Sequence, residues 1–371
     1  MIVLSQFKNK PLLFKKPVSI IAAYNPAALK SCFDEIERAL KSGYYLAGFL
    51  SYEAGYVFEP RLQQERNYDF PLCYMGVYGP PEHYLPWPAT SCRSATLKNL
   101  RLNISQERYF ANIAAIRDYI AQGDVYQITY CLKLLFDFQG SPWHLYRSLL
   151  KEQPVPYPAY IETEEFDILS LSPEKFLKKN SDRIITKPMK GTWPRGDTFV
   201  SDFIERVRFG HDRKNRAENV MIADLLRNDL GRVGSRVRAP RLFEVTGYKT
   251  LYQMTSTVIA SLPEAIPLYR LFSALFPSGS VTGAPKIRAM EIIRQLETQD
   301  RRIYTGAIGY ITPRKDLFFN IPIRTLLIRN GRGEMGIGGG IVWDSTAQGE
   351  WEEGLLKARF VTDLFEKTEK Q

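Results

Sequence analysis

A lysine within a glycine-containing segment is the first candidate for chemistry in this chain. The segment PMKGTWPRG at 188–196 places Lys190 directly ahead of Gly191 and Thr192, with other cations close by. A lysine among cations loses its proton more readily and can act as a nucleophile, while glycine lets a substrate approach the main chain and a threonine hydroxyl can hold an oxyanion. Because the ordinary pKa of lysine is about 10.4, half-ionisation at pH 7 requires that pKa to fall by roughly 3. The segment indicates either a nucleophilic amine or a basic loop that binds nothing.

Carboxylates form the second group of candidates. Glu174 follows a proline at the expected end of a strand, where loop residues often reach an active site, although a lone glutamate is also typical of a solvated surface. Glu218 stands near the start of an amphipathic helix, and Glu350, Glu353 and Lys357 recur at helical spacing on one face. Mg²⁺ prefers oxygen ligands and retains waters, so Glu218, Glu353 and Glu350 are a candidate metal set. The alternative is an exposed face of glutamates and lysines.

Small residues mark two further segments. The stretch FPSGSVTGAP at 276–285 combines glycines and small hydroxyls with the start of a helix, a combination that forms an anion nest. The phosphate-binding pattern GxxxxGK[ST] is absent, which favours a carboxylate ligand or a purely structural turn. The run Gly338-Gly339-Gly340 sits in a strand-like stretch and forfeits side-chain packing, which indicates close approach by a ligand or by another backbone.

Hydrophobic periodicity predicts the elements that position these residues. Helices are predicted at 26–41, 105–123, 216–229, 266–275, 285–296 and 350–366, and strands at 44–52, 125–138, 159–162, 166–171, 183–186, 241–248, 303–312, 317–329 and 335–343. In the helix at 216–229, Val220, Met221 and Ala223 are expected to belong to the buried stripe. The proline-rich span 71–92 is typical of surface loops and short edge strands. Consecutive late strands joined by turns such as Asn330-Gly331 favour antiparallel hairpins, so the expected class is α+β.

Composition excludes several classes of protein. The chain has 371 residues, 44% of them hydrophobic and 24% charged, and no apolar run long enough for a transmembrane helix, so no membrane association is expected. Four cysteines without a CxxC pair and three histidines argue against a zinc site and a disulfide framework. The net charge of +10 is spread out without a run of basic residues, so a nucleic-acid-binding module is the weaker alternative. The start lacks a secretion signal, and we expect a cytoplasmic protein.

Taken together, several strings resemble the chorismate-binding enzymes. ENVMIADLLRNDLGRVG, SGSVTGAPK and GGGIVWDS followed by EEGLLKAR occur in the order typical of that family. The likeness covers about residues 104–365, with a looser match at 49–60. It implies a single large α+β domain over 1–371, with two antiparallel sheets packed as a core and helices outside. Within it, 1–100 would be a shortened N-terminal portion and 101–371 the chorismate-binding portion.

The resemblance also implies a reaction. Lys190 stands where the anthranilate-forming branch of the family carries alanine, which favours the branch that converts chorismate and ammonia to 4-amino-4-deoxychorismate for p-aminobenzoate and folate synthesis. In that branch the lysine attacks ring carbon 2, expels the 4-hydroxyl, and is released when ammonia attacks carbon 4. Gln127 stands where isochorismate synthases place a water-activating lysine, so water addition lacks its general base. The anthranilate-forming branch is the enzymatic alternative, and a non-catalytic scaffold subunit is the alternative of another class.

The remaining site residues follow from the same resemblance. Glu174 would be the general acid, and Mg²⁺ would be held by Glu218 and Glu353 with Glu350 in support through water. The substrate-binding set is Gly191, Thr192, Gln127, Gln253, Tyr304, Arg324, Gly338, Gly339 and Lys357, of which Tyr304, Arg324 and the two glycines match the site of the enolpyruvyl carboxylate. Asn215 and Gln253 depart from the acidic residue and the histidine that many members carry. Ammonia is expected from a separate glutamine amidotransferase subunit, and no clear tryptophan-binding string is found.

Overall fold

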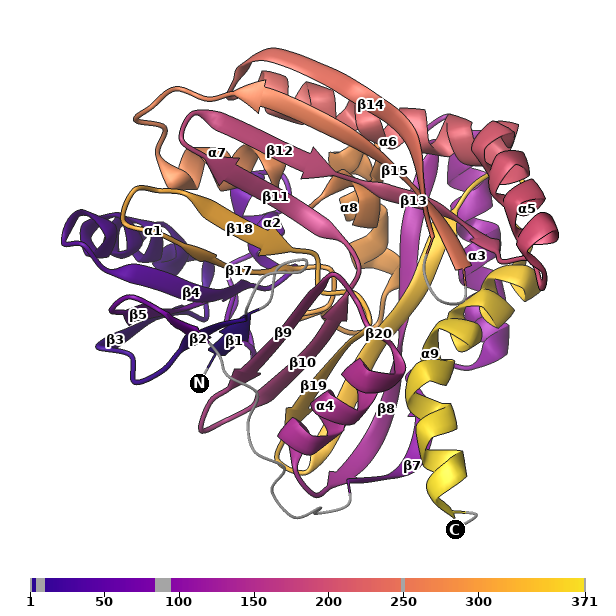
Figure 1. The fold of residues 1–371 in the computed structure, drawn as a ribbon, viewed down its shortest axis with the longest axis horizontal. Coiled ribbons are helices and arrows are strands. Elements are labelled where there is room, and N and C mark those ends of the chain that lie inside the picture. Colours follow the sequence, from indigo (N-terminus) through magenta and orange to yellow (C-terminus); the bar gives the residue numbers. More distant parts are fainter. Residues whose placement is uncertain (1, 5–10, 84–94, 248–250, 370–371) are drawn as a thin grey trace.

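The computed structural model describes residues 2–4, 11–83, 95–247 and 251–369, and two β-sheets dominate it. In the described part each sheet has ten strands, and every pair of neighbouring strands is antiparallel (Figure 1). The first sheet runs in the order β16-β8-β20-β19-β10-β9-β1-β2-β6, with β7 beside β8, and the second in the order β13-β15-β12-β11-β18-β17-β4-β5-β3, with β14 beside β15. The α+β class with antiparallel sheets is therefore confirmed.

The strands have the following bounds. The first sheet contains β1 (Ile2–Leu4), β2 (Leu12–Phe14), β6 (Glu82–His83), β7 (Thr96–Leu102), β8 (Gln127–Gln139), β9 (Tyr157–Glu162), β10 (Asp167–Ser172), β16 (Gly283–Ala284), β19 (Thr325–Arg329) and β20 (Arg332–Ile341). The second contains β3 (Ser19–Ala23), β4 (Tyr45–Leu50), β5 (Cys73–Tyr78), β11 (Lys175–Asn180), β12 (Arg183–Lys187), β13 (Met189–Pro194), β14 (Ser235–Gly247), β15 (Leu251–Ser261), β17 (Ala307–Ile311) and β18 (Leu317–Asn320).

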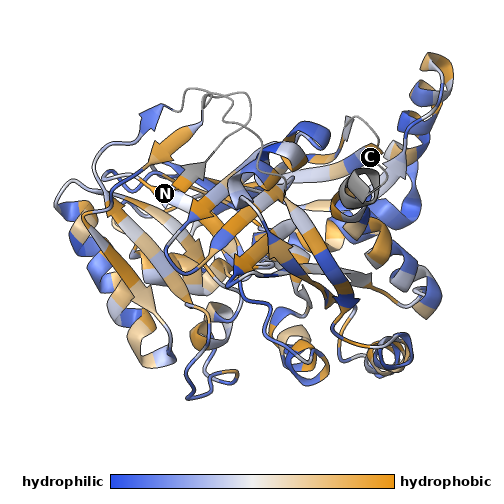
Figure 2. Ribbon diagram, turned by 90° about the horizontal axis from the view of Figure 1, so that it is seen from below, coloured by the Kyte–Doolittle hydropathy of each residue, from blue (hydrophilic) through white to orange (hydrophobic). Residues whose placement is uncertain are grey.

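The helices cover the outer faces of the sheets. They are α1 (Pro26–Lys41), α2 (Ala54–Phe58), α3 (Gln106–Ala121), α4 (Pro142–Glu152), α5 (Phe199–His211), α6 (Arg213–Gly231), α7 (Leu268–Leu275), α8 (Lys286–Leu296) and α9 (Ala347–Glu369), with a short 3₁₀ turn at Gly279–Val281. Helices α3, α4, α8 and α9 share one hydrophobic cluster with the first sheet, and α1, α6 and α7 share another with the second. Figure 2 shows the corresponding pattern, with apolar strands inside and polar outward surfaces on the helices. None of the described helices is long and apolar enough to cross a membrane.

Local signals explain why the early helices begin where they do. Asn25 accepts a 3.0 Å hydrogen bond from the N–H of Ala28, and Pro26 occupies the first turn of α1. Ser105 accepts a 3.3 Å hydrogen bond from the N–H of Arg108 at the start of α3. Both helices lie within one or two residues of their predicted bounds, because capping and periodicity are properties of the local sequence.

A third apolar cluster joins the two sheets. It contains side chains of β4 and β17 from the second sheet and of β9, β10 and β19 from the first. At its centre the ring of Phe49 stacks on Phe70 at 5.2 Å and meets Phe166 edge-on at 5.9 Å. Burial of each such side chain contributes roughly 1.5–3 kcal/mol to stability. This cluster holds the two sheets together.

The structure corrects three predictions. The predicted strand at 317–329 is two strands in different sheets, β18 and β19, because Pro322 lacks a donor for a sheet ladder and the chain crosses between the sheets there. The span 71–92, predicted as surface loops and short edge strands, includes β5, which is mostly buried between β3 and β4. The prolines of the span flank this strand and do not interrupt it. Residues 84–92 of the span lie outside the described residues. Val220, expected in the buried stripe of α6, is 44% exposed, and Ile222 is buried instead.

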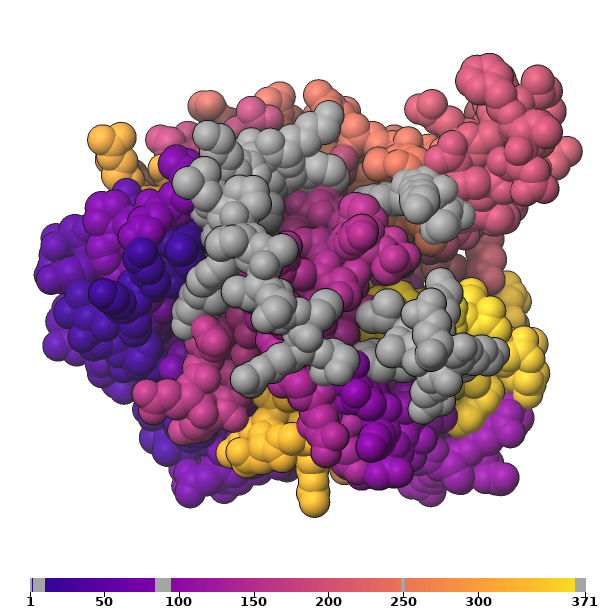
Figure 3. Space-filling model, turned by 60° about the horizontal axis from the view of Figure 1, so that its bottom comes forward, coloured from indigo at the N-terminus to yellow at the C-terminus, as the bar shows by residue number. Residues whose placement is uncertain are grey.

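Several elements were not predicted at all. They include β11, β13, β15, α4 and α5. Strand β14 was predicted, but it begins six residues before the predicted start at 241. Helix α5 stands out from the body of the molecule in the space-filling view (Figure 3). Its exposed apolar residues, Phe199, Val200, Phe203, Ile204 and Val207, explain why periodicity alone did not identify it as a surface helix.

Candidate active site

The candidate site lies where β13 of the second sheet meets β20 of the first. Nζ of Lys190, on β13, lies 2.9 Å from the position that a Cβ atom on Gly340 would take, and the side-chain nitrogen of Gln127 lies closer still. A side chain at position 340 would therefore collide with both groups. At Gly338 a Cβ atom would instead collide with the carbonyl oxygen of Tyr130 on β8. The glycine run thus admits a neighbouring backbone, as predicted, and also side chains of this chain.

Lys190 has the environment that an amine nucleophile requires. Its side chain is half-buried, and burial lowers the pKa of the amine. The carboxylates of Glu218 and Glu174 act against that change, while the positive charge of Lys357 acts with it. The net result is a pKa below the ordinary value, so a larger fraction of the amine is neutral at a given pH.

Glu174, between β10 and β11, faces the same region from a buried position. Its Oε1 accepts a 2.7 Å hydrogen bond from the hydroxyl of Ser280, which lies 3.0 Å from the hydroxyl of Ser278. Burial raises the pKa of Glu174 to about 7, although the Ser280 hydrogen bond and the charge of Lys190 both lower it. A carboxyl group with that pKa is present in both protonation states near neutrality, as a general acid must be.

The segment at 276–285 therefore has a role that the sequence did not specify. One of its hydroxyls, that of Ser280, binds the carboxylate of Glu174, a group of the protein itself. Another, that of Thr282, donates to the carbonyl of Ser278 at 3.1 Å and so stabilises the turn. Asp229 of α6 forms a buried 2.6 Å ion pair with Lys286, which follows the segment at the start of α8. Sequence reasoning missed Ser280 as a site residue, although the density of small hydroxyls in SGSVTG marked the segment.

Carboxylates from α6 and α9 border the lysine. Burial raises the pKa of Glu218, and the nearby Glu353 raises it as well, whereas Lys190 lowers it. Glu353 forms a 2.7 Å ion pair with Lys357; burial alone would raise its pKa, but the surrounding lysines outweigh burial and the net pKa is low. Oε1 of Glu350 accepts a 2.6 Å hydrogen bond from Ser345, and burial raises its pKa.

These carboxylates do not form a complete metal site by themselves. Among the described residues, no group of three or more histidine, cysteine, aspartate or glutamate side chains is placed to hold an ion. The charge of Glu353 on α9 nevertheless raises the pKa of Glu218 on α6. Mg²⁺ commonly takes one or two protein carboxylates and completes its shell with substrate and water. The pair therefore suits an ion shared with an anionic substrate, and not a site built by the protein alone.

Gln127 is a buried side chain whose amide could bind a ligand. Its side chain is fully buried, and neither its amide nitrogen nor its oxygen has a hydrogen-bond partner among the described residues. Leaving a buried polar group unpaired costs about 1–3 kcal/mol, which a ligand that pairs with the amide would recover.

Nearby, Gly339 faces Oε2 of Glu350 at 2.9 Å and Nζ of Lys357 at 3.6 Å, measured from the position of a Cβ atom. Lys357 also donates to the carbonyl of Gly338 at 2.7 Å.

Tyr304 lies against β20, and Arg324 lies between β18 and β19. The ring of Tyr304 is buried and covers Gly336, two residues before Gly338 on β20, where any side chain would displace it. Arg324 is half-buried at the crossing from β18 to β19, with a φ of 52°, and its carbonyl accepts a 3.0 Å hydrogen bond from the N–H of Leu171. Both residues are thus placed by the strands that carry the glycine run and Glu174.

The two residues after Lys190 differ in what determines their position. Gly191 has a φ of 84° and lies against the side-chain oxygen of Asn215 on α6. Both the backbone conformation and this contact require a glycine at position 191. Thr192 is exposed and is paired across the ladder with Gln253 of β15, which is buried. Of the predicted set, Thr192 is therefore the member least enclosed by the site.

Comparison with known proteins identifies the family. The sequence model of the family described as chorismate binding enzyme matches residues 2–363, and the chain belongs to this family. It is 38% identical to the aminodeoxychorismate synthase component 1 of Escherichia coli (strain K12) over 71% of this chain and 59% of that protein. It is 36% identical to the anthranilate synthase component 1 of Aquifex aeolicus (strain VF5) over 72% of this chain and 55% of that protein. The chain thus spans less than two thirds of the length of these curated relatives.

Solved structures agree with this placement. The fold matches anthranilate synthase component I from Streptococcus pneumoniae TIGR4 with a TM-score of 0.82 and 25% identity, over 96% of this chain and 91% of that one. It also matches the menaquinone-specific isochorismate synthase MenF of Escherichia coli, with a TM-score of 0.79 and 15% identity, over 98% and 88% of the two chains. The resemblance seen in the sequence is confirmed.

Proposed function

We propose that this chain converts chorismate and ammonia to 4-amino-4-deoxychorismate, as a step in the synthesis of p-aminobenzoate and folate. The observation that carries the proposal is the half-buried amine of Lys190, which lies against Gly340 beside the unpaired amide of Gln127 and whose pKa is lowered by burial. The similarity to a protein named aminodeoxychorismate synthase component 1 supports the same assignment. The identity of the substrate rests on membership of the family.

In the first step, the neutral Nζ of Lys190 bonds to ring carbon 2 of chorismate. The ring double bonds shift, and the bond between carbon 4 and its hydroxyl oxygen breaks. Glu174 gives its proton to that oxygen, which leaves as water, so Glu174 becomes a carboxylate and the adduct nitrogen carries a positive charge. A pKa of about 7 for Glu174 makes the donated proton available near neutral pH.

In the second step, ammonia bonds to carbon 4 and the double bonds shift back. The bond between carbon 2 and Nζ breaks, so Lys190 leaves as a neutral amine. The new ammonium group at carbon 4 gives one proton to the Glu174 carboxylate, which restores the acid for the next turnover. Charge is balanced at each step by groups already facing the lysine, namely Glu174 and Glu218.

We assign the Mg²⁺ expected for the family to Glu218 and Glu353, with Glu350 supporting it through a water. The ion would neutralise the carboxylate on the substrate ring. Tyr304, Arg324 and the amides at Gly338 and Gly339 would hold the enolpyruvyl carboxylate, since a guanidinium matches a carboxylate in a bidentate manner. Gln127, Gln253, Gly191, Thr192 and Lys357 would complete the pocket.

Ammonia would come from a separate glutamine amidotransferase subunit. A glutaminase of the usual kind needs an accessible cysteine thiolate, and the described cysteines, Cys32, Cys73 and Cys131, are all buried. We therefore expect an ammonium salt to replace that subunit in vitro.

The test is to incubate the chain with chorismate, Mg²⁺ and an ammonium salt and to identify the products by mass spectrometry. 4-Amino-4-deoxychorismate with its enolpyruvyl group retained supports the proposal. Anthranilate with free pyruvate would instead establish the second candidate, which the similarity to proteins named anthranilate synthase favours. Absence of any chorismate turnover would point to a non-catalytic subunit.

A further inference from the structure

A polar cavity lies apart from the lysine site, at the ends of β19 and β20. It has a volume of about 1120 Å³ and is bordered by α2, the end of α8, the segment that follows α8, and parts of β7 and β8. Sites for small molecules commonly measure about 300–1,000 Å³, so the space is large enough for a ligand. The chemistry proposed above uses none of the charged side chains that line it.

The lining of this cavity has an excess of positive charge. It contains seven arginines against five aspartates and glutamates. One of those acids, Glu53, is buried, and burial raises its pKa to about 8, with the neighbouring Asp300 adding to the effect. Glu53 is therefore largely protonated at neutral pH, which increases the positive excess.

Four of the arginines can still form ion pairs with a ligand. Among the described residues, Arg101, Arg294, Arg329 and Arg332 form no ion pair, in contrast to the other three arginines of the lining. Arg329 donates one hydrogen bond, to the carbonyl of Asp69 at 2.7 Å, and the side chain of Arg332 donates none within the part of the chain that the structure describes. A guanidinium has five N–H donors in a fork that matches carboxylate and phosphate oxygens. This group of arginines fits a small molecule with more than one anionic group.

A residue that lines the cavity also contacts the segments that position Lys190 and Glu174. Arg301 is 2% exposed and is paired with Glu297 at 2.6 Å at the cavity wall. Its guanidinium also donates to the carbonyl of Thr129 at 2.6 Å and to that of Val281 at 2.9 Å. Thr129 is the ladder partner of Gly340, against which Lys190 lies, and Val281 follows the Ser280 that binds Glu174.

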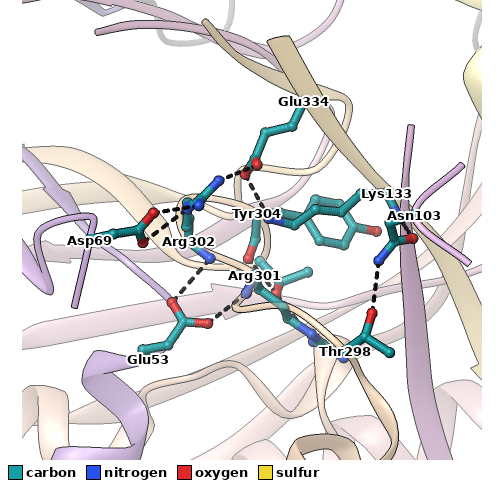
Figure 4. Close-up of polar contacts among 10 residues, drawn as sticks. Glu53, Asp69, Asn103, Lys133, Thr298, Arg301, Arg302, Tyr304 and Glu334 are labelled. Atoms are coloured by element: carbon teal, nitrogen blue, oxygen red, sulfur yellow. Dashed lines mark hydrogen bonds and ion pairs between the residues drawn. The ribbon is translucent and has the colours of Figure 1, made fainter. Parts of the chain in front are cut away.

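A second connection runs through Glu53. Its carboxyl oxygens accept hydrogen bonds from the N–H groups of Arg301 at 2.7 Å and Arg302 at 3.0 Å, as Figure 4 shows. Arg302 in turn binds Asp69 and Glu334, so the segment leading to Tyr304 is held on both sides by groups that line the cavity. Any ligand that displaces one of these ion pairs acts on the segment that carries Tyr304.

We propose that this arginine-lined cavity is a second binding site, which takes a small molecule with two or more carboxylate or phosphate groups, and that its occupation is transmitted to the lysine site through the segment 297–304. The binding part of this proposal is independent of the reaction proposed above. The transmission part rests on that function, because it is read out with chorismate.

Binding is tested by titrating the full chain calorimetrically, without Mg²⁺, with citrate and separately with pyrophosphate. The diagnostic variant is Arg329→Gln/Arg332→Gln, and the matched control is Arg183→Gln/Arg232→Gln, which removes the same charge at exposed positions outside the cavity. We expect saturable binding of at least one probe to the wild type and to the control, and at least tenfold weaker binding to the diagnostic variant. A preference between the probes identifies carboxylate or phosphate as the natural group.

Two results would overturn the binding part. One is no saturable binding of either probe, and the other is equal binding to the diagnostic and control variants, which would place the probe at the lysine site or on the general surface. If the diagnostic variant does not fold, Arg101→Gln, at an exposed position of the same lining, replaces it. For transmission, we expect the bound probe to change the affinity for chorismate by about fivefold or more in the wild type and in the control, but not in the diagnostic variant. Unchanged affinity with the probe bound would refute transmission and leave the site itself standing.

Discussion

The hydroxyl of Ser280 donates a 2.7 Å hydrogen bond to Glu174 across 106 residues of sequence, and both side chains are buried. This bond stabilises the ionised form of Glu174 and so lowers its pKa against the larger effect of burial, which raises it. The hydrogen bond therefore tunes the proposed general acid, because it holds the pKa of Glu174 near 7 when burial alone would set it higher.

The first prediction concerns this bond. Replacing Ser280 by alanine removes a hydrogen bond worth about 1 kcal/mol, so the pKa of Glu174 rises by roughly 0.7. Since the acid acts in its protonated form, the limb on which activity falls with rising pH moves to higher pH by the same amount. The pH profile of chorismate amination measures this. Ser273→Ala, at a half-buried serine bonded to its own helix, is the control, and an unshifted limb in Ser280→Ala would contradict the tuning role.

Glu174 itself gives a second prediction, on stability. Its pKa is 4.5 when unperturbed and about 7 in the folded chain, so the folded state binds the proton more tightly than the unfolded state. Stability from this group is complete below pH 4.5 and is lost as the pH rises through 7, by roughly 3 kcal/mol in all. Glu174→Gln removes that loss. We expect the variant to gain stability over the wild type between pH 5 and pH 8 in chemical denaturation, while its amination rate falls. A constant difference at all pH values would show that Glu174 is not the titrating group.

A third prediction addresses the lysine. Lys190→Ala should lower the amination rate by roughly 10³-fold or more, because the proposed nucleophile is gone and the neighbouring amine of Lys357 is already bound to Glu353 and to the carbonyl of Gly338. Chorismate binding, measured by calorimetry, should persist. Denaturing quench of the wild type during turnover, followed by intact-mass analysis, should show the covalent adduct on position 190. Lys30→Ala, on the exposed side of α1, is the control, and undiminished turnover by Lys190→Ala would exclude the covalent route.

The fourth prediction uses the glycine run. A methyl group at position 340 would lie 2.9 Å from Nζ of Lys190 and closer still to Gln127, so Gly340→Ala should displace the lysine and abolish amination. Gly231→Ala, at the end of α6, meets nothing within 4 Å and should be neutral or gain up to about 1 kcal/mol in stability. Comparable activity in the two variants would show that Gly340 is not beside the reacting amine.

The sequence predicted the parts of this structure that depend on neighbouring residues. The helix at 26–41 has a cap, a proline in its first turn and a regular apolar stripe, all of which are local. The turn at Asn330-Gly331 joins β19 to β20 as an antiparallel hairpin, as expected. Recognition of the family motifs also brought Lys190, Glu174 and Glu218 into one candidate site, and the structure places their charges within mutual influence.

The rest depended on contacts between distant parts of the chain. Nothing near Arg301 in the sequence indicates that its guanidinium reaches the carbonyl of Thr129, 172 residues away. The crossing between β18 and β19 was hidden because both strands are apolar and only a few residues separate them. Such features follow from how the sheets pack, and a pattern read along one chain does not contain that information.

The last prediction tests the link between Glu53 and Tyr304. Glu53→Ala leaves the buried N–H of Arg301 and that of Arg302 without their acceptors, at about 1–3 kcal/mol each. Glu53→Gln keeps one carbonyl acceptor and should lose about half as much, as measured by urea denaturation. If the segment positions Tyr304 for substrate, KM for chorismate should rise in the same order, alanine above glutamine above wild type, with a smaller change in kcat. Loss of stability without any change in KM would show that Glu53 supports the fold but does not position the substrate.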